Sequence, residues 1–225
     1  LYAAFNEIDE ARFVLERLRE WVQEGQRRDS IAILYRSNAQ SRVFEELLLS
    51  DGIPYRVYGG LRFFERAEIK DALAYLRLIS NRHSDPSFER VVNVPTRGIG
   101  ARTATAIREH ARASDTSMWT AAVELASKTQ IPTRARTSLN YFIDLIEALD
   151  ASTRDLDLTE QTDIVVQRSG LIDHYREQHG EKAQTRVENL EGLVTAARQF
   201  NYDPADDQHP DPLSEFLAHA ALEAG

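Results

Sequence analysis

The stretch Val91-Val-Asn-Val-Pro-Thr-Arg-Gly-Ile-Gly-Ala-Arg-Thr-Ala-Thr-Ala-Ile107 predicts a short helix, a turn from Pro95 to Gly100, and the start of a second helix. Gly98 and Gly100 allow backbone geometries that other residues avoid and let a partner approach the main chain closely. The unpaired amides that begin the second helix, together with the helix dipole, attract an anion. Arg97, Arg102 and Thr103 add two charges and a hydroxyl donor, which suits a DNA phosphate. A tight connection between two packed helices is the alternative interpretation.

The charge distribution places one cationic segment inside an acidic chain. The 225 residues include 27 Lys and Arg against 36 Asp and Glu, a net charge of −9. This balance excludes a nucleic-acid-binding protein that is basic over its whole surface. Residues 60–114 carry 10 basic and 6 acidic side chains, whereas residues 115–225 carry 9 and 20. The cationic segment contains the glycine turn.

Residues 1–58 alternate between strand and helix patterns. Apolar runs at Leu1–Phe5, Ile31–Tyr35 and Pro54–Tyr58 predict buried strands, and the residues between them show helical spacing, with Asn6 as an N-cap. This order predicts a small, partial α/β unit of the parallel βαβ kind. We expect its neighbouring strands to lie outside this chain.

A second candidate DNA contact follows the second predicted strand. Arg36, Asn38 and Arg42 are placed to contact phosphates, and Tyr35 is placed to stack on a base, at the strand end where α/β sheets bind ligands. The same residues suit a capped helix start with arginines on the surface equally well.

The pattern changes at Gly59-Gly60. Beyond these glycines apolar residues recur at helical spacing, which predicts a mainly α region. Arg66 and Lys70 share one helix face there, which lies on DNA or faces solvent. Residues 201–212 are rich in Pro and Asp and predict a solvated loop.

Several chemistries have no support in the sequence. Zero cysteines exclude disulfides and cysteine-based zinc sites and suit a reducing cytosol. No run approaches the roughly 20 apolar residues of a membrane helix. There is no Gly-x-x-x-x-Gly-Lys-Ser/Thr phosphate loop and no His-Glu-x-x-His spacing. We therefore expect a cytoplasmic chain with no membrane contact, no metal site and no catalytic residues.

Four longer motifs are Ala32-Ile-Leu-Tyr-Arg-Ser-Asn-Ala-Gln-Ser-Arg42, Tyr58-Gly-Gly-Leu-Arg-Phe-Phe-Glu-Arg66, Glu68-Ile-Lys-Asp-Ala-Leu-Ala-Tyr-Leu-Arg-Leu78 and Asn93-Val-Pro-Thr-Arg-Gly-Ile-Gly100. At these motifs the sequence resembles the UvrD/PcrA/Rep superfamily-1 DNA helicases. Further matches at residues 184–190 and 214–225 extend the resemblance over essentially the whole chain. The resemblance implies part of a RecA-like motor domain, 2A, at residues 1–58 and a helical domain, 2B, at residues 59–225.

The resemblance also implies an activity. Helicases of this family use ATP and Mg²⁺ to move 3′ to 5′ on single-stranded DNA and to unwind duplex in mismatch and nucleotide-excision repair. Their phosphate loop and magnesium-binding carboxylate motif are missing from this sequence, so we expect this chain alone to be inactive. The implied partners are single-stranded and duplex DNA, helicase domains 1A and 1B, the remainder of 2A, and repair proteins such as MutL.

The family's functional residues map onto three places in this chain. Arg36, Asn38 and Arg42 fall in the segment that contacts single-stranded DNA. Gly98, Ile99, Gly100 and Thr103 fall in a helix-hairpin-helix that grips duplex DNA, and Lys70 lies at a nearby duplex contact. Gly59 and Gly60 lie at the hinge between 2A and 2B. The acidic residues 115–225 leave a second function open, an acidic protein-interaction or autoinhibitory module that binds repair partners.

Overall fold

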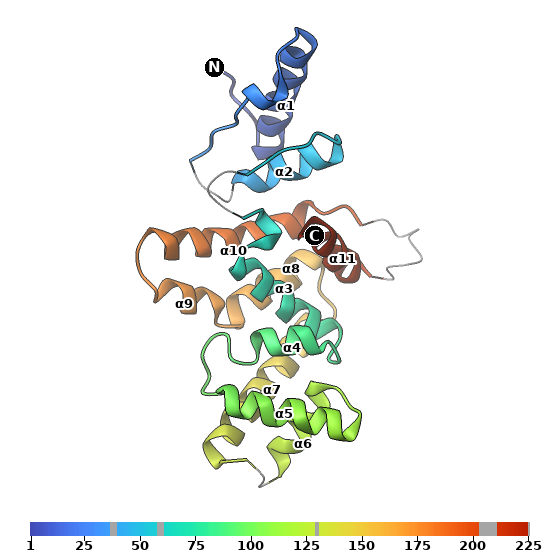
Figure 1. Ribbon diagram of the computed structural model, residues 1–225, viewed down its shortest axis with the longest axis vertical. Coiled ribbons are helices and arrows are strands. Elements are labelled where there is room, and N and C mark those ends of the chain that lie inside the picture. Colours follow the sequence, from blue (N-terminus) through green and yellow to red (C-terminus); the bar gives the residue numbers. More distant parts are fainter. Residues whose placement is uncertain (37–39, 58–60, 129–130, 203–210, 225) are drawn as a thin grey trace. The chain divides into compact units, whose positions relative to one another are not determined.

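The computed structural model describes residues 1–36, 40–57, 61–128, 131–202 and 211–224. Over these ranges the chain is mainly helical, which confirms the predicted helical class (Figure 1). The chain divides into two compact units, Leu1–Arg66 and Ala67–Glu223. Asn38, Gly59 and Gly60 lie outside the described residues, so the structure gives no view of the predicted hinge.

The first unit is built on two helices, α1 (Glu7–Gln23) and α2 (Ser41–Ser50), which pack against each other. Asn6 Oδ1 accepts a hydrogen bond of 2.8 Å from the Asp9 amide, which confirms the predicted N-cap. Two single-turn 3₁₀ helices, η1 (Arg28–Ser30) and η3 (Phe63–Glu65), complete the described elements of this unit. Phe63 and Phe64 are buried.

The strands predicted in this unit are absent from its described residues. The segments 1–5, 31–35 and 54–57 form no strand. Ile31 and Ile33 are half-buried while Ala32 and Leu34 are exposed, so the side chains alternate as they do in a strand. A strand requires a hydrogen-bonded neighbour, and no described segment supplies one. The structure therefore shows the two predicted helices without the βαβ unit.

The second unit is entirely helical where it is described. Its elements in chain order are α3 (Ala67–Ser80), α4 (Asp85–Val91), α5 (Ala101–Ser114), α6 (Met118–Ser127), α7 (Thr133–Thr153), α8 (Leu158–Arg168), α9 (Leu171–Arg176), α10 (Glu181–Gln199) and α11 (Pro212–Ala224). These helices confirm the mainly α region that the spacing of apolar residues predicted.

Helix α3 is the centre of the second unit, because it packs against α4, α7, α8 and α10. Its Tyr75, Leu76 and Leu78 have no exposed surface. A second cluster joins α4, α6 and α7, where the rings of Phe88 and Phe142 lie edge to face at 5.6 Å. The two clusters fix α4, which precedes the glycine turn, and α5, which follows the turn, packs against α6.

Candidate nucleic-acid interface

The glycine turn leads from α4 into an uncapped helix. Gly100 is the N-cap residue of α5, and no side chain caps that end, which confirms the predicted helix start. The amides of Thr103 and Ala104 donate to the Gly100 carbonyl oxygen at 3.0 and 3.1 Å. The amides of Ala101 and Arg102 have no acceptor in the described part of the chain. Because Gly100 is exposed, these two amides are available to an anion.

Ile99 anchors the turn from within. Its side chain is 2% exposed, whereas Gly98 and Gly100 on either side are exposed. Gly98 has φ +82°, and a Cβ atom there would lie 3.2 Å from Ser138 Oγ on α7. Ile99 therefore holds the turn against the core and does not itself face a partner. Gly98 is required by both its φ angle and its close neighbour.

Asn93 shapes the turn, although it was not among the residues predicted to act there. Its Oδ1 atom accepts hydrogen bonds from the amides of Arg97 at 2.9 Å and Ile99 at 3.1 Å. The one signal in the sequence is its position four residues before Arg97, since Asn side chains commonly bond to nearby amides in turns. Asn93 thus satisfies two backbone amides of the turn.

Arg97 packs against the turn and stabilises it through hydrogen bonds. The guanidinium lies 5.7 Å from the ring centres of Tyr75 and Phe142. It donates to three backbone carbonyl oxygens, those of Val91 at 3.3 Å, Pro95 at 3.1 Å and Ser169 at 2.9 Å. With its donors bound to carbonyls, Arg97 holds the turn, and this geometry does not support the phosphate contact predicted for it.

Tyr75 supports the same turn from α3. Its hydroxyl donates to the Val94 carbonyl oxygen at 2.7 Å. Burial raises the pKa of Tyr75, and the neighbouring Arg97 guanidinium opposes that rise only in part. The phenol is therefore a neutral donor at physiological pH, as the bond to Val94 requires.

Three candidate side chains around the turn remain available. Arg102 is exposed and forms no ion pair with the described residues, and Thr103 is half-buried beside it. Lys70 is half-buried on α3 and likewise has no ion pair within the described ranges. Lys70 precedes Tyr75 by five residues, about 7.5 Å along the helix.

A buried polar network adjoins Lys70 on α3. Tyr175 Oη donates to Asp71 Oδ2 at 2.5 Å, and Arg90 Nε lies 2.7 Å from Asp71 Oδ1. Burial raises the pKa of Asp71, and the Tyr175 and Arg90 contacts lower it in part. Asn189 Nδ2 donates to the neighbouring Glu68 at 2.6 Å. The network ties α3 to α4, α9 and α10 and thereby fixes the helix that carries Lys70.

The single-stranded DNA candidates in the first unit differ in exposure. Tyr35 is half-buried, and Arg36 is exposed with its amide bonded to Gln40 Oε1 at 3.1 Å. The Arg42 side chain is only 3% exposed and pairs with Glu46 at 2.7 Å and Glu7 at 3.3 Å. Arg42 therefore links α1 to α2, and this position does not support the direct DNA contact predicted for it.

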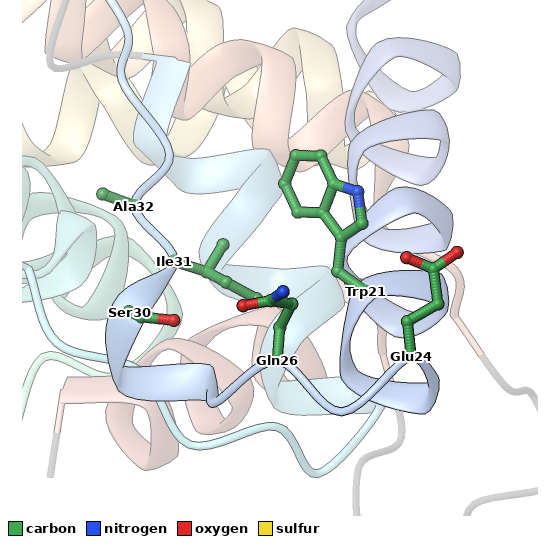
Figure 2. Close-up of a pocket in the computed structure, with 6 residues that line it drawn as sticks. All are labelled: Trp21, Glu24, Gln26, Ser30, Ile31 and Ala32. Atoms are coloured by element: carbon green, nitrogen blue, oxygen red, sulfur yellow. The ribbon is translucent and has the colours of Figure 1, made fainter.

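The first unit also contains an open pocket (Figure 2). Trp21 projects into it from α1 and is 48% exposed, and Ile31 projects toward it from the segment after η1. The lining residues are Trp21, Glu24, Gln26, Ser30, Ile31 and Ala32. Because the lining contains no cation, the pocket does not suit a phosphate.

No group of three or more His, Asp and Glu side chains among the described residues is arranged to hold a metal ion. No helix in the described ranges is long and apolar enough to cross a membrane.

Comparison with known proteins identifies the family. The model of the UvrD-like helicase C-terminal domain matches residues 1–225. The chain is 56% identical to DNA helicase II of Escherichia coli over 225 residues, which is the whole chain and 31% of that protein. It is 37% identical to the ATP-dependent DNA helicase PcrA of Bacillus subtilis over 222 residues, or 98% of the chain and 29% of that protein. The chain thus spans about a third of the length of these relatives, and it belongs to the UvrD-like helicase C-terminal domain family.

Proposed function

We propose that this chain is the DNA-binding part of an ATP-dependent DNA helicase and that its second unit holds duplex DNA ahead of the unwinding fork and regulates unwinding. Two relatives named DNA helicase II and ATP-dependent DNA helicase PcrA support this assignment. The structural observation that carries it is the exposed, uncapped start of α5 beside Gly100.

The turn is suited to bind a DNA phosphate group, which does not depend on the base sequence. The amides of Ala101 and Arg102 donate to an anionic oxygen in line with the helix dipole, and the Arg102 guanidinium and Thr103 hydroxyl donate to the same group or its neighbour. Asn93 and Arg97 hold the turn in its binding shape before DNA arrives. A preformed site loses little conformational entropy on binding.

We further propose that residues 1–58 form part of motor domain 2A and residues 59–225 form domain 2B, with Gly59 and Gly60 as the hinge. Tyr35, Arg36 and Asn38 are the proposed single-stranded DNA contacts, and Arg42 acts by positioning the helix that follows them. ATP and Mg²⁺ would bind through domains 1A and 2A of the longer protein. The proposed setting is 3′ to 5′ unwinding in mismatch and nucleotide-excision repair in the cytoplasm, with MutL as a partner.

A salt titration with variants of α5 tests the duplex grip. Fluorescence anisotropy of a labelled duplex is measured with the 225-residue chain at several salt concentrations. Arg102→Ala should weaken binding and lower the slope of log K against log salt by about 0.9, the value for one lost phosphate contact. Arg112→Ala, an exposed arginine at the other end of α5, is the matched control and should leave the slope unchanged.

A glycine variant tests the amides directly. A Cβ atom at Gly100 would meet nothing within 4 Å, and the φ angle of −80° is open to any residue. Gly100→Val should therefore fold normally while its branched side chain covers the free amides and weakens duplex binding. Wild-type binding that is insensitive to salt, or equal losses from Arg102→Ala and Arg112→Ala, would contradict the proposed grip.

One observation favours a second function, an acidic protein-interaction or autoinhibitory module. Residues 115–225 carry 20 acidic against 9 basic side chains, and Asp144 and Glu147 on α7 are exposed. Reversing both charges with Asp144→Arg and Glu147→Arg should abolish capture of a partner that uses this surface, such as the separately expressed motor domains. Duplex binding should survive the same reversals, because the protein gains two positive side chains that attract the DNA polyanion. Loss of duplex binding instead would count against this module as a separate surface.

A further inference from the structure

We propose that the duplex-contacting surface extends from the glycine turn onto one face of α7, where Arg134, Ser138 and Tyr141 contact the DNA backbone. This inference rests on the proposed duplex grip and adds residues to it. These three residues lie more than 30 positions beyond Gly100, outside the cationic segment of the sequence.

Two contacts place α7 against the turn. A Cβ atom at Gly98 would lie 3.2 Å from Ser138 Oγ, so the exposed backbone of Gly98 adjoins Ser138 directly. The Arg97 guanidinium lies 5.7 Å from the ring centre of Phe142, one helical turn after Ser138. A DNA backbone that reaches Gly98 therefore also reaches α7 near Ser138.

The neighbours of Ser138 on the helix are a cation and an aromatic donor. Arg134 precedes Ser138 by four residues and Tyr141 follows it by three, so all three share one face of α7. Arg134 is exposed and Tyr141 is 62% exposed. Neither side chain forms an ion pair or hydrogen bond with any residue that the structure describes. Arginine and tyrosine side chains are common donors to DNA phosphates.

The charge distribution along α7 favours DNA binding beside the first half of this helix only. The basic residues Arg134 and Arg136 lie in the first two turns, whereas Asp144, Glu147 and Asp150 follow in the second half. Arg134 on α7 and Arg102 on α5 therefore supply cations from two helices to the surface around Gly98. Because the acidic half of α7 repels phosphate, the DNA path should end near Tyr141.

Two arginines on α7 provide a matched test. Arg136 lies two residues after Arg134, about 200° around the helix, and so points away from the face of Ser138. In the anisotropy titration with labelled duplex, Arg134→Ala should weaken binding about three- to fivefold. It should also lower the salt slope by about 0.9. Arg136→Ala should change neither quantity, and Tyr141→Phe should weaken binding less than Arg134→Ala because it removes only one hydroxyl.

The outcomes separate this proposal from the grip on which it rests. Equal effects of Arg134→Ala and Arg136→Ala, with Gly100→Val still weakening binding, would overturn the α7 surface and leave the grip in place. A wild-type chain that binds no duplex at low salt would overturn both. Circular dichroism of each variant verifies that the helical fold is kept, and Arg134→Glu, expected to weaken binding more than Arg134→Ala, provides a second readout at the same position.

Discussion

The Nη2 atom of Arg97 donates a 2.9 Å hydrogen bond to the carbonyl oxygen of Ser169, a residue 72 positions later in the chain. Ser169 immediately follows α8, and a Cβ atom on the next residue, Gly170, would lie 3.4 Å from Pro95 Cγ. The turn that begins α5 is thus fixed to the end of α8. The shape of the proposed phosphate site therefore depends on the fold of the whole second unit.

Arg97→Ala should lower the free energy of unfolding by about 2 kcal/mol, because three carbonyl oxygens lose a charged donor and two rings lose a cation. Urea denaturation followed by circular dichroism measures this loss. Arg97→Lys should recover little of it, since an ammonium group lacks the planar fork of the guanidinium. The control Arg112→Ala should stay within about 0.5 kcal/mol of wild type. Weakened duplex binding with unchanged stability would instead mean that Arg97 contacts phosphate directly.

Gly98→Ala should destabilise the second unit by about 1 to 2 kcal/mol, because φ +82° is strained for an L residue and the new methyl group approaches Ser138 Oγ at 3.2 Å. Combining it with Ser138→Ala removes the close oxygen but keeps the strained backbone. The double variant should therefore be more stable than the sum of the single effects predicts, by about 0.5 kcal/mol or more. Strict additivity of the three unfolding free energies would show that Gly98 and Ser138 are not in contact.

Asp71→Asn should change how stability depends on pH. Burial raises the pKa of Asp71 above its ordinary value of 3.8, so its contribution to stability is fully present below pH 3.8 and is lost as the pH rises through the raised folded value. The free energy of unfolding of the wild type minus that of Asp71→Asn should thus fall as the pH rises from about 3 to 6. A difference that rises with pH for Asp71→Asn would contradict a raised pKa.

Arg42→Met should loosen the first unit, because the 3% exposed arginine pairs with carboxylates on both α1 and α2. We expect a loss of about 2 kcal/mol, less than for a fully buried pair, since Glu7 is half-exposed. Hydrogen exchange of the amides in α1 and α2 reports this loss. Weaker binding of single-stranded DNA with unchanged exchange would instead restore Arg42 as a direct contact.

The helices were predictable because their signals are local. The cap of Asn6 on the Asp9 amide and the start of α5 after Gly100 each involve residues within four positions of one another. The strands expected at residues 31–35 and 54–57 depend on pairing with another strand, and none of the described residues provides it. The apolar runs therefore predicted side chains that alternate between buried and exposed, but they could not establish that these segments pair into a sheet.

The sequence by itself determined where the helices lie, that one cationic segment interrupts an acidic chain, and that an uncapped helix begins at the glycine turn. Only the tertiary structure decided which arginines remain available to a partner. Arg97 and Arg42 are bound by carbonyl oxygens and carboxylates, whereas Arg102 and Arg134 stay exposed. The physical reason is that the availability of a side chain depends on contacts between helices distant in sequence, such as Gly98 with Ser138, which no local pattern encodes.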